Sequence, residues 1–324
     1  MKEWLQRNTR ASMRPILYIP FARRVLKWLQ LEFYIRFNQP NYYVRLKYSS
    51  KLRNLSNFML ANEMTGGYIT GKAEFYLKTP DGIFLYYNFR SDRHTLADGQ
   101  GLDFKRAFNP SSALEKFIME YLRDGMIVFD VGANNGYYYS LKIARQFRNC
   151  QVFAFEPDPR ILYHLERNIA INDVNNVRVI QQALSNRTGK ARMTALLGAS
   201  NFLVDGSHAS NETVSVECNT LDNFVAQNRI HRLDFIKVDI EGQECNFLLG
   251  AARSLARFKP LIVLELNDTL LRRSGASTSS ALSLLRAAGY ECFRVRGSYD
   301  AVAAPKTRVR SIRKRGRGWL DLAT

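Results

Sequence analysis

The stretch from Ile127 to Tyr137, IVFDVGANNGY, decides the fold of this chain. Branched and aromatic residues run into an acid, and two glycines and two asparagines follow where the chain must turn. An apolar pattern of helical spacing comes next, so the stretch predicts a buried strand, a tight loop and a helix N-terminus. The unpaired N–H groups and partial positive charge of such an N-terminus favour a polar ligand. The stretch therefore predicts a cradle for a nucleotide-type cofactor.

The glycine spacing indicates which cofactor. A dinucleotide-binding loop reads G-x-G-x-x-G, and its second glycine lets the backbone approach a pyrophosphate. Asn134 stands at that place here, and no third glycine follows, so the loop favours a ligand with one nucleoside and a small zwitterionic tail, such as S-adenosylmethionine. Glu156 ends the next apolar run about 20 residues later, the spacing at which a carboxylate reaches ribose hydroxyls. A βαβ unit without a ligand is the alternative.

Composition sets the broad class of the protein. The chain has 324 residues, of which 46% are hydrophobic, enough for one large domain or one domain with an extension. No apolar run approaches the length of a membrane span, and no signal peptide is apparent. The four cysteines lack disulfide or metal-ligand spacing, which fits a reducing compartment, and we expect a cytoplasmic protein. They are Cys150, Cys218, Cys245 and Cys292.

The net charge of +18 lies almost entirely at the two ends, residues 1–60 and 304–318. Residues 21–37 have the spacing of a basic amphipathic helix, which can lie on the inner face of an anionic membrane or pack on the domain. The basic tail can equally be a solvated loop before a last edge strand at residues 318–322. Any electrostatic partner is therefore met by the ends.

Three regions follow from the pattern along the chain. Residues 1–60 predict a basic, aromatic helical extension, and residues 61–111 a small β appendage with a hairpin at Asp81-Gly82. Residues 112–324 alternate strands and helices, which predicts an α/β domain with a mostly parallel sheet and helices on both faces. Residues 188–218 alternate around turns instead, so we expect a β excursion that projects from this sheet.

Four acids stand where predicted strands end: Asp130, Glu156, Asp239 and Glu265. Ligands on parallel sheets bind at the carboxyl ends of the strands, so these side chains should meet on one rim. Asp239 and Glu241 share one strand-to-helix turn, DIEGQE, and are candidates for a general base together with His208. The alternative for His208 is an exposed loop histidine. A divalent ion shared by the rim acids is conceivable but not expected.

Six segments together resemble one family in their order and spacing. They match the FkbM family of S-adenosylmethionine-dependent methyltransferases, and the likeness covers residues 112–295 but neither the first hundred residues nor the basic tail. The second asparagine of the loop replaces the more usual Ile or His. The segments are VFDVGANNGYY (128–138), FEPDP (155–159), QALS (182–185), TLD (220–222), VDIEGQE (238–244) and EL (265–266).

The resemblance implies a seven-stranded Rossmann-like sheet and O-methylation of a sugar, glycan or related small molecule. It implies that Glu156 holds the ribose, that the backbone of Gln182 and Ala183 edges the adenine, and that Asp239 and Glu241 face the methyl group or the acceptor. It also places four residues at the methionine end of the cofactor: Asp130, Gly132, Asn134 and Gly136.

Two other functions compete with this one. The basic ends suit a nucleic-acid methyltransferase, but the DIEG turn lacks the Pro-Pro-aromatic loop that grips a base, and its acids would repel phosphate. A membrane-surface scaffold with a vestigial cofactor domain is the third reading, and the intact loop argues against it. The sequence does not indicate the acceptor or the oligomeric state.

Overall fold

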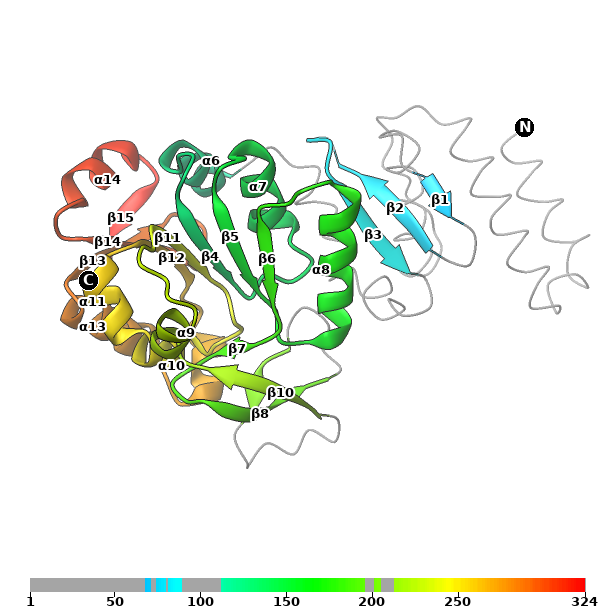
Figure 1. Cartoon of the computed structure of the whole chain (residues 1–324). Helices are drawn as coiled ribbons and strands as arrows, with labels where there is room; N and C mark the ends of the chain where they lie inside the picture. Colours follow the sequence, from blue (N-terminus) through cyan, green and yellow to red (C-terminus); the bar gives the residue numbers. More distant parts are fainter. Residues whose placement is uncertain are drawn as a thin grey trace, which may run out of the picture.

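The computed structural model describes residues 68–70, 74–79, 81–88, 112–195, 201–204 and 213–323 (Figure 1). The predicted helical extension over residues 1–60 and the loop with His208 lie outside the described residues. No helix within these ranges is long and apolar enough to cross a bilayer.

The central sheet has the strand order β15-β13-β14-β12-β11-β4-β5-β6. The five strands from β12 to β6 run parallel, and β14 is antiparallel to both of its neighbours. The seven-stranded Rossmann-like arrangement is thus present, and β15 adds an eighth strand at one edge. The bounds are β4 Ile127–Val131, β5 Gln151–Phe155, β6 Val177–Ile180, β11 Phe235–Val238, β12 Leu261–Glu265, β13 Tyr290–Val295, β14 Asp300–Pro305 and β15 Leu320–Leu322.

The register aligns the carboxyl ends of the central strands. Asp130 on β4 pairs with Lys237 on β11, and Glu265 on β12 pairs with Asp300 on β14. Chain order reverses between β4 and β11, so this rim is the switch point at which α/β sheets bind ligands. The expectation that the four strand-ending acids share one rim is confirmed.

Helices cover both faces of the sheet, as predicted, and each face has its own hydrophobic core. One core joins the sheet to α6, α7 and α14, and the other joins it to α9, α10, α11 and α13. Side chains cap two of these helices, since Thr220 and Ser277 each accept a backbone N–H at a helix start. The bounds are α6 Ala113–Tyr121, α7 Lys142–Gln146, α8 Pro159–Ile171, α9 Leu221–Gln227, α10 Glu244–Gly250, α11 Ala252–Phe258, α12 Asp268–Leu271, α13 Thr278–Ala287 and α14 Val309–Arg315.

The predicted β excursion is a separate four-stranded sheet with the order β7-β10-β8-β9. It leaves the end of β6 and projects below the central sheet in Figure 1. Its strands have a small core of their own, which includes Met193 and Val216. The bounds are β7 Ala183–Leu184, β8 Gly189–Thr194, β9 Leu203–Val204 and β10 Thr213–Asn219.

The predicted hairpin is also present, as β2 (Glu74–Lys78) and β3 (Phe84–Asn88), with β1 (Tyr68–Thr70) beside β2. β3 packs beside α8 (Figure 1), and two asparagine side chains, in α8 and at its C-terminal end, bond the backbone of β3. The Oδ1 atoms of Asn168 and Asn172 accept the N–H groups of Tyr86 at 2.6 Å and Phe84 at 2.8 Å. Asn168 also donates to the carbonyl of Asn135, which links the appendage to the glycine loop.

Two elements near the C-terminus differ from the sequence analysis. The basic tail contains a helix, α14, where the pattern indicated a solvated loop. The periodicity is hard to read because Ile312 is the one residue that this short helix buries. β14 was not predicted, because DAVAAP is rich in alanine and ends in proline, residues of low strand propensity. The edge strand expected at residues 318–322 is present as β15.

Candidate active site

The glycine loop packs directly against the turn that follows β11. Gly132 and Asn134 both have positive φ angles, of 81° and 52°. A Cβ atom on Gly132 would lie 1.9 Å from the backbone oxygen of Asp239. The space beside Gly132 is filled by the backbone of the protein itself. Because Gly132 has no Cβ, the glycine loop and the turn after β11 can lie in contact, and these two segments form the two halves of the site.

Asp130 organises the helix that follows the loop. Its Oδ2 accepts the backbone N–H of Ser140 at 3.1 Å and the Ser140 hydroxyl at 2.5 Å. Ser140 belongs to a π-helical turn, Tyr137–Leu141, which precedes α7. Such turns recur at functional sites. Burial raises the pKa of Asp130 to about 6, although Ser140 and Lys237 stabilise its charge.

Glu156 joins the loop to the end of β5. Its Oε2 accepts the N–H of Asn134 at 3.0 Å, and its Oε1 accepts the N–H of Asp158 at 2.9 Å. The side chain is buried, and burial raises its pKa to about 7. Two further donors, such as a pair of hydroxyl groups, would favour the ionised form of this carboxylate.

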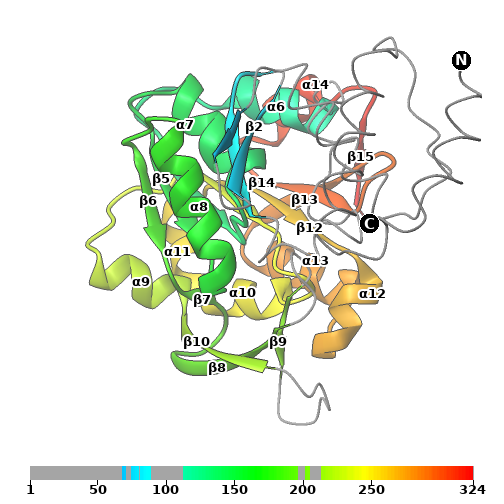
Figure 2. The same cartoon turned by 90° about the vertical axis from the view of Figure 1, so that its right-hand side faces the viewer.

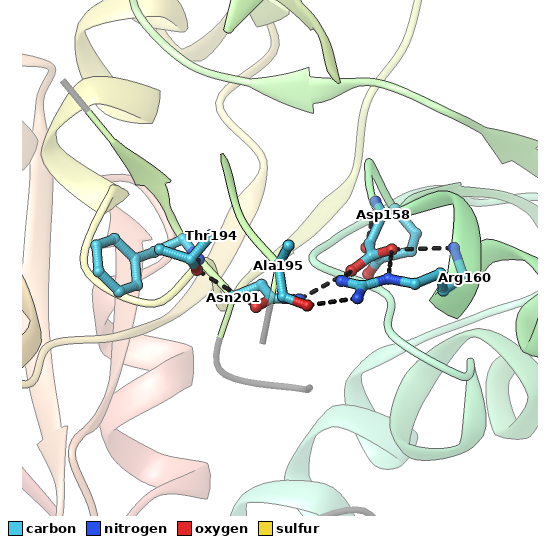
Figure 3. Close-up of polar contacts among 7 residues, drawn as sticks. Asp158, Arg160, Thr194, Ala195 and Asn201 are labelled. Carbon is cyan, nitrogen blue, oxygen red and sulfur yellow. Dashed lines mark hydrogen bonds and ion pairs between the residues drawn. The ribbon is translucent and has the colours of Figure 1, made fainter. Parts of the chain in front are cut away.

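Asp158 ties the end of β5 to the β excursion (Figure 3). Its Oδ2 accepts from the Arg160 guanidinium at 2.6 Å and from the Asn201 amide at 2.8 Å. Arg160 also donates to the carbonyl of Ala195, so residues 195 and 201 are both held by this ion pair. Burial opposes ionisation, but the Arg160 and Asn201 donors hold the pKa of Asp158 below its usual value. The excursion is thereby fixed beside Glu156.

The turn after β11 brings the candidate bases to the rim. Glu241 has a φ of 56°, a conformation that costs about 1 kcal/mol or more in a residue with a Cβ and that gathers at functional sites. Burial and the charge of Asp239 raise the pKa of Glu241 to about 7, and Arg273 opposes that rise. Glu244 instead accepts the N–H groups of Ile240 and Gly242, so it braces the turn.

Several carboxyl groups crowd together at the rim, and they raise one another's pKa. The Asp239 side chain is 45% exposed, and burial together with Asp239 and Glu241 raises the pKa of Glu265 to about 8. Within the described parts of the chain, no three His, Cys, Asp or Glu side chains are placed to hold a metal ion. The geometry offers carboxylates of different protonation state beside a loop that leads into a helix, an arrangement suited to proton transfer.

A profile of the methyltransferase FkbM domain matches residues 130–292, half of the chain. The chain belongs to the FkbM methyltransferase family. It is therefore a methyltransferase, and the family implies the use of S-adenosylmethionine. The matched region begins at Asp130 and ends within β13, so it contains every rim acid described above.

Relatives of this FkbM methyltransferase include one protein named as an O-methyltransferase and one named for a sugar acid. The 2-O-methyltransferase NoeI of Sinorhizobium fredii is 26% identical over 179 residues, covering 49% of this chain and 70% of that protein. The hexuronic acid methyltransferase AglP of Haloferax volcanii is 25% identical over 150 residues, covering 46% of this chain and 59% of that protein. A methyltransferase FkbM structure from Methylobacillus flagellatus aligns with a TM-score of 0.41 and 17% identity, over 89% of this chain and 60% of that one.

The predicted site residues of this FkbM methyltransferase fall into three groups. Gln182 follows β6, and Ala183 begins β7 in pairing with Cys218. They therefore stand where the chain leaves the central sheet for the excursion. His208 lies outside the described residues. The remaining residues lie together on the glycine loop and at the ends of β4, β5 and β11: Asp130, Gly132, Asn134, Gly136, Glu156, Asp239 and Glu241.

Sequence reasoning assigned no role to Asp158, Asn201 or Lys237. Asp158 belongs to the FEPDP segment, but its structural role comes from its hydrogen bond with Asn201. These two residues are distant in sequence, and no local pattern encodes their contact. Lys237 did leave a signal, because it is a lysine in the middle of a buried parallel strand, where aliphatic residues are the rule.

Proposed function

We propose that this FkbM methyltransferase transfers a methyl group from S-adenosylmethionine to a hydroxyl of a sugar or glycan. The observation that carries the proposal is the contact of Gly132 with Asp239, which sets the Glu156 side of the rim directly beside the Glu241 side. The name of NoeI supports transfer to an oxygen, and the name of AglP supports a sugar-type acceptor. An in-line displacement needs donor and acceptor held in this kind of close register.

The residues present fit the cofactor. Glu156 is a buried carboxylate with a raised pKa, and ribose hydroxyls would supply the donors that it lacks. Asn134 and Gly136 would receive the methionine end on the loop, and Asp130 would hold that loop through Ser140. Gln182 and Ala183 would edge the adenine. When bound, the cofactor supplies the electrophilic methyl carbon.

Glu241 is the general base of this proposal. A sugar hydroxyl is a weak nucleophile, and a base works best when its pKa lies near the working pH. Burial and the neighbouring Asp239 raise the pKa of Glu241 to about 7, and its side chain is half-buried at the rim. Asp239, which is more exposed, would orient the acceptor hydroxyl by accepting a hydrogen bond.

A transfer assay tests the function. The purified full chain is incubated with S-adenosylmethionine carrying a labelled methyl group and with a panel of neutral sugars, uronic acids and short glycans. We expect label on at least one carbohydrate. The label should stay on the sugar after the glycosidic bonds are cleaved, and it should resist mild base, because a methyl ether is stable to mild base and a methyl ester is not. Label on RNA or DNA in a parallel reaction, with none on any carbohydrate, would contradict the proposal.

We also propose that the basic end of the domain contacts an anionic membrane. Exposed cations cover α14 and its flanks, among them Arg310, Lys314 and Arg317. α14 and the excursion lie at opposite ends of the molecule in both views (Figures 1 and 2). A nucleic acid bound at α14 would therefore stand away from the rim, whereas a membrane there leaves the rim open to its acceptor.

A flotation assay checks this contact. The full chain should float with vesicles rich in phosphatidylserine and not with neutral vesicles. Each basic residue near such a surface contributes about 1 kcal/mol. The pair Arg310→Glu and Lys314→Glu should therefore weaken binding at least tenfold, while Lys190→Glu with Arg192→Glu, on the excursion, should leave it unchanged. Equal flotation with neutral vesicles would refute the contact.

A further inference from the structure

Lys237 is a fully buried lysine beneath the acidic rim. Its side chain is 2% exposed. It belongs to β11, a central strand between β4 and β12 in a sheet covered on both faces. The Nζ atom lies 3.2 Å from Oδ2 of Asp239 and 3.9 Å from Oδ1 of Asp300. It is also 3.3 Å from the carbonyl of Val238 and 5.4 Å from the ring centre of Tyr139. One cation therefore serves two carboxylates on different strands.

An aliphatic residue would fill this place at a lower cost. Taking a lysine out of water is expensive, and buried ion pairs contribute little net stability compared with well-packed apolar residues. Burial disfavours the charged amine, yet Asp239, Tyr139 and Asp300 raise the pKa of Lys237 above its ordinary value. The amine is therefore charged throughout the working pH range, and its role is to be sought in the groups around it.

The charge of Asp239 acts on three glutamates near the end of β11. It raises the pKa of Glu241, of Glu244 and of Glu265, in each case together with burial. Lys237 opposes this crowding of negative charge, because its cation lowers the pKa of Asp130 and of Glu265. The groups that face this cluster come from β4, the π-helical turn, β11 and its turn, β12, β14 and the segment after α12: Asp130, Tyr139, Lys237, Glu241, Glu244, Glu265, Asp300 and Arg273.

We propose that Lys237 is a positioning residue whose buried cation holds the Asp239 carboxylate at the rim and offsets the shared negative charge of Asp239 and Glu241, so that this pair loses its protons at a lower pH than it would without the cation. Asp300 competes with Asp239 for the same amine, so it moderates the effect. The assignment of the base rests on the proposed function, but the coupling among these side chains does not. The hydroxyl proton passes to a Glu241 oxygen as the new oxygen–carbon bond forms and the sulfur–carbon bond breaks.

Two substitutions should move the titration in opposite directions. Lys237→Met removes the cation and leaves Asp239 facing other carboxylates, so the shared titration of Asp239 and Glu241 moves to higher pH. Asp300→Asn removes the competing carboxylate, so Lys237 acts on Asp239 alone and the titration moves to lower pH. A role confined to packing gives no such pair of opposite shifts, because both changes would only loosen the fold.

The test is a carbon NMR titration of the full chain with labelled Asp and Glu carboxyl groups. Signals are assigned with Asp239→Asn and Glu241→Gln. We expect a rise of about one pKa unit in Lys237→Met, a tenfold change in proton affinity, and a fall in Asp300→Asn. Midpoints that stay at the wild-type value in both variants, or that move in the same direction, overturn the proposal. If Lys237→Met does not fold, Lys237→Gln is titrated in its place, and midpoints that stay at the wild-type value overturn the proposal.

The same variants separate this inference from the proposed function. If methyl transfer to a sugar is found and its pH profile follows the NMR midpoints, both stand. If the midpoints shift but no carbohydrate is methylated, the coupling stands and the proposed function fails. If transfer occurs with one pH profile in all three proteins, the proposed function stands and the role of Lys237 is refuted.

Discussion

Replacing Glu241 with glutamine should lower methyl transfer by about 10²- to 10⁴-fold, the usual contribution of a general base. The amide keeps the size of the side chain but cannot take a proton from the acceptor hydroxyl. Affinity for S-adenosylhomocysteine should persist, because the residues proposed to hold the cofactor lie on the loop and at the ends of β5 and β6. Steady-state transfer rates, beside titration calorimetry of the same preparations, check both parts.

Glu217→Gln is the matched control, since this glutamate is exposed on β10 of the excursion. It should transfer methyl groups at the wild-type rate. A Glu241→Gln enzyme that works as fast as wild type would remove Glu241 from the chemistry and leave Asp239 as the remaining described candidate.

The pH dependence of this reaction has a definite sign. Burial and Asp239 raise the pKa of Glu241 to about 7, so the group is protonated below that pH and cannot act as a base. Transfer should therefore fall as pH drops through 7 in the wild type. The raised pKa also means that ionising Glu241 destabilises the folded state as pH rises from the unfolded value toward 7. Glu241→Gln should accordingly unfold at a higher temperature than wild type at pH 8.

Gly132→Ala should disrupt the protein more than any other change to the loop. The new Cβ would lie 1.9 Å from the Asp239 oxygen and 2.9 Å from its carbonyl carbon, and backbone atoms cannot give way as a flexible side chain can. Gly125→Ala is a close control, because Gly125 has a φ of 80° against 81° at Gly132, but a Cβ atom on it would meet no atom of the described residues within 4 Å.

The two alanines therefore separate strain from collision. Positive φ alone should cost about 1–2 kcal/mol at either position. The collision should add at least about 2 kcal/mol at Gly132, the cost typical of overpacking. Urea unfolding of both variants measures the difference. Equal destabilisation would mean that the glycine loop and the turn after β11 are not in contact. It would contradict the proposal that this contact holds the two halves of the site together.

Local patterns were sufficient where one segment carried the whole signal. The strand, glycine loop and helix from Ile127 onward and the Asp-Gly hairpin were predicted, because each depends on residues adjacent in sequence. The meeting of the rim acids followed from the rule that parallel strands end on one edge. β14 was missed because its alanines are held by pairing with β12 and β13, not by their own propensity.

Contacts between distant segments were beyond the sequence. Nothing local announces that Asn201 bonds Asp158, or that Lys237 reaches Asp300 across β12. The loop glycines show the same limit. A turn was expected at Gly132, but its contact with the Asp239 backbone, which leaves no room for a Cβ atom, was not. The proposed roles of Gln182, Ala183 and His208 stay predictions of the family resemblance.

Cofactor binding tests the central claim most directly. Titration calorimetry of the full chain with S-adenosylhomocysteine should show micromolar binding, which Glu156→Ala abolishes and Glu166→Ala, an exposed change on α8, leaves intact. Loss in Glu156→Ala alone would establish that the carboxylate joining Asn134 to the end of β5 holds the cofactor. A folded wild-type chain that binds no S-adenosylhomocysteine, or a Glu156→Ala variant that binds it as well as wild type, would contradict the account.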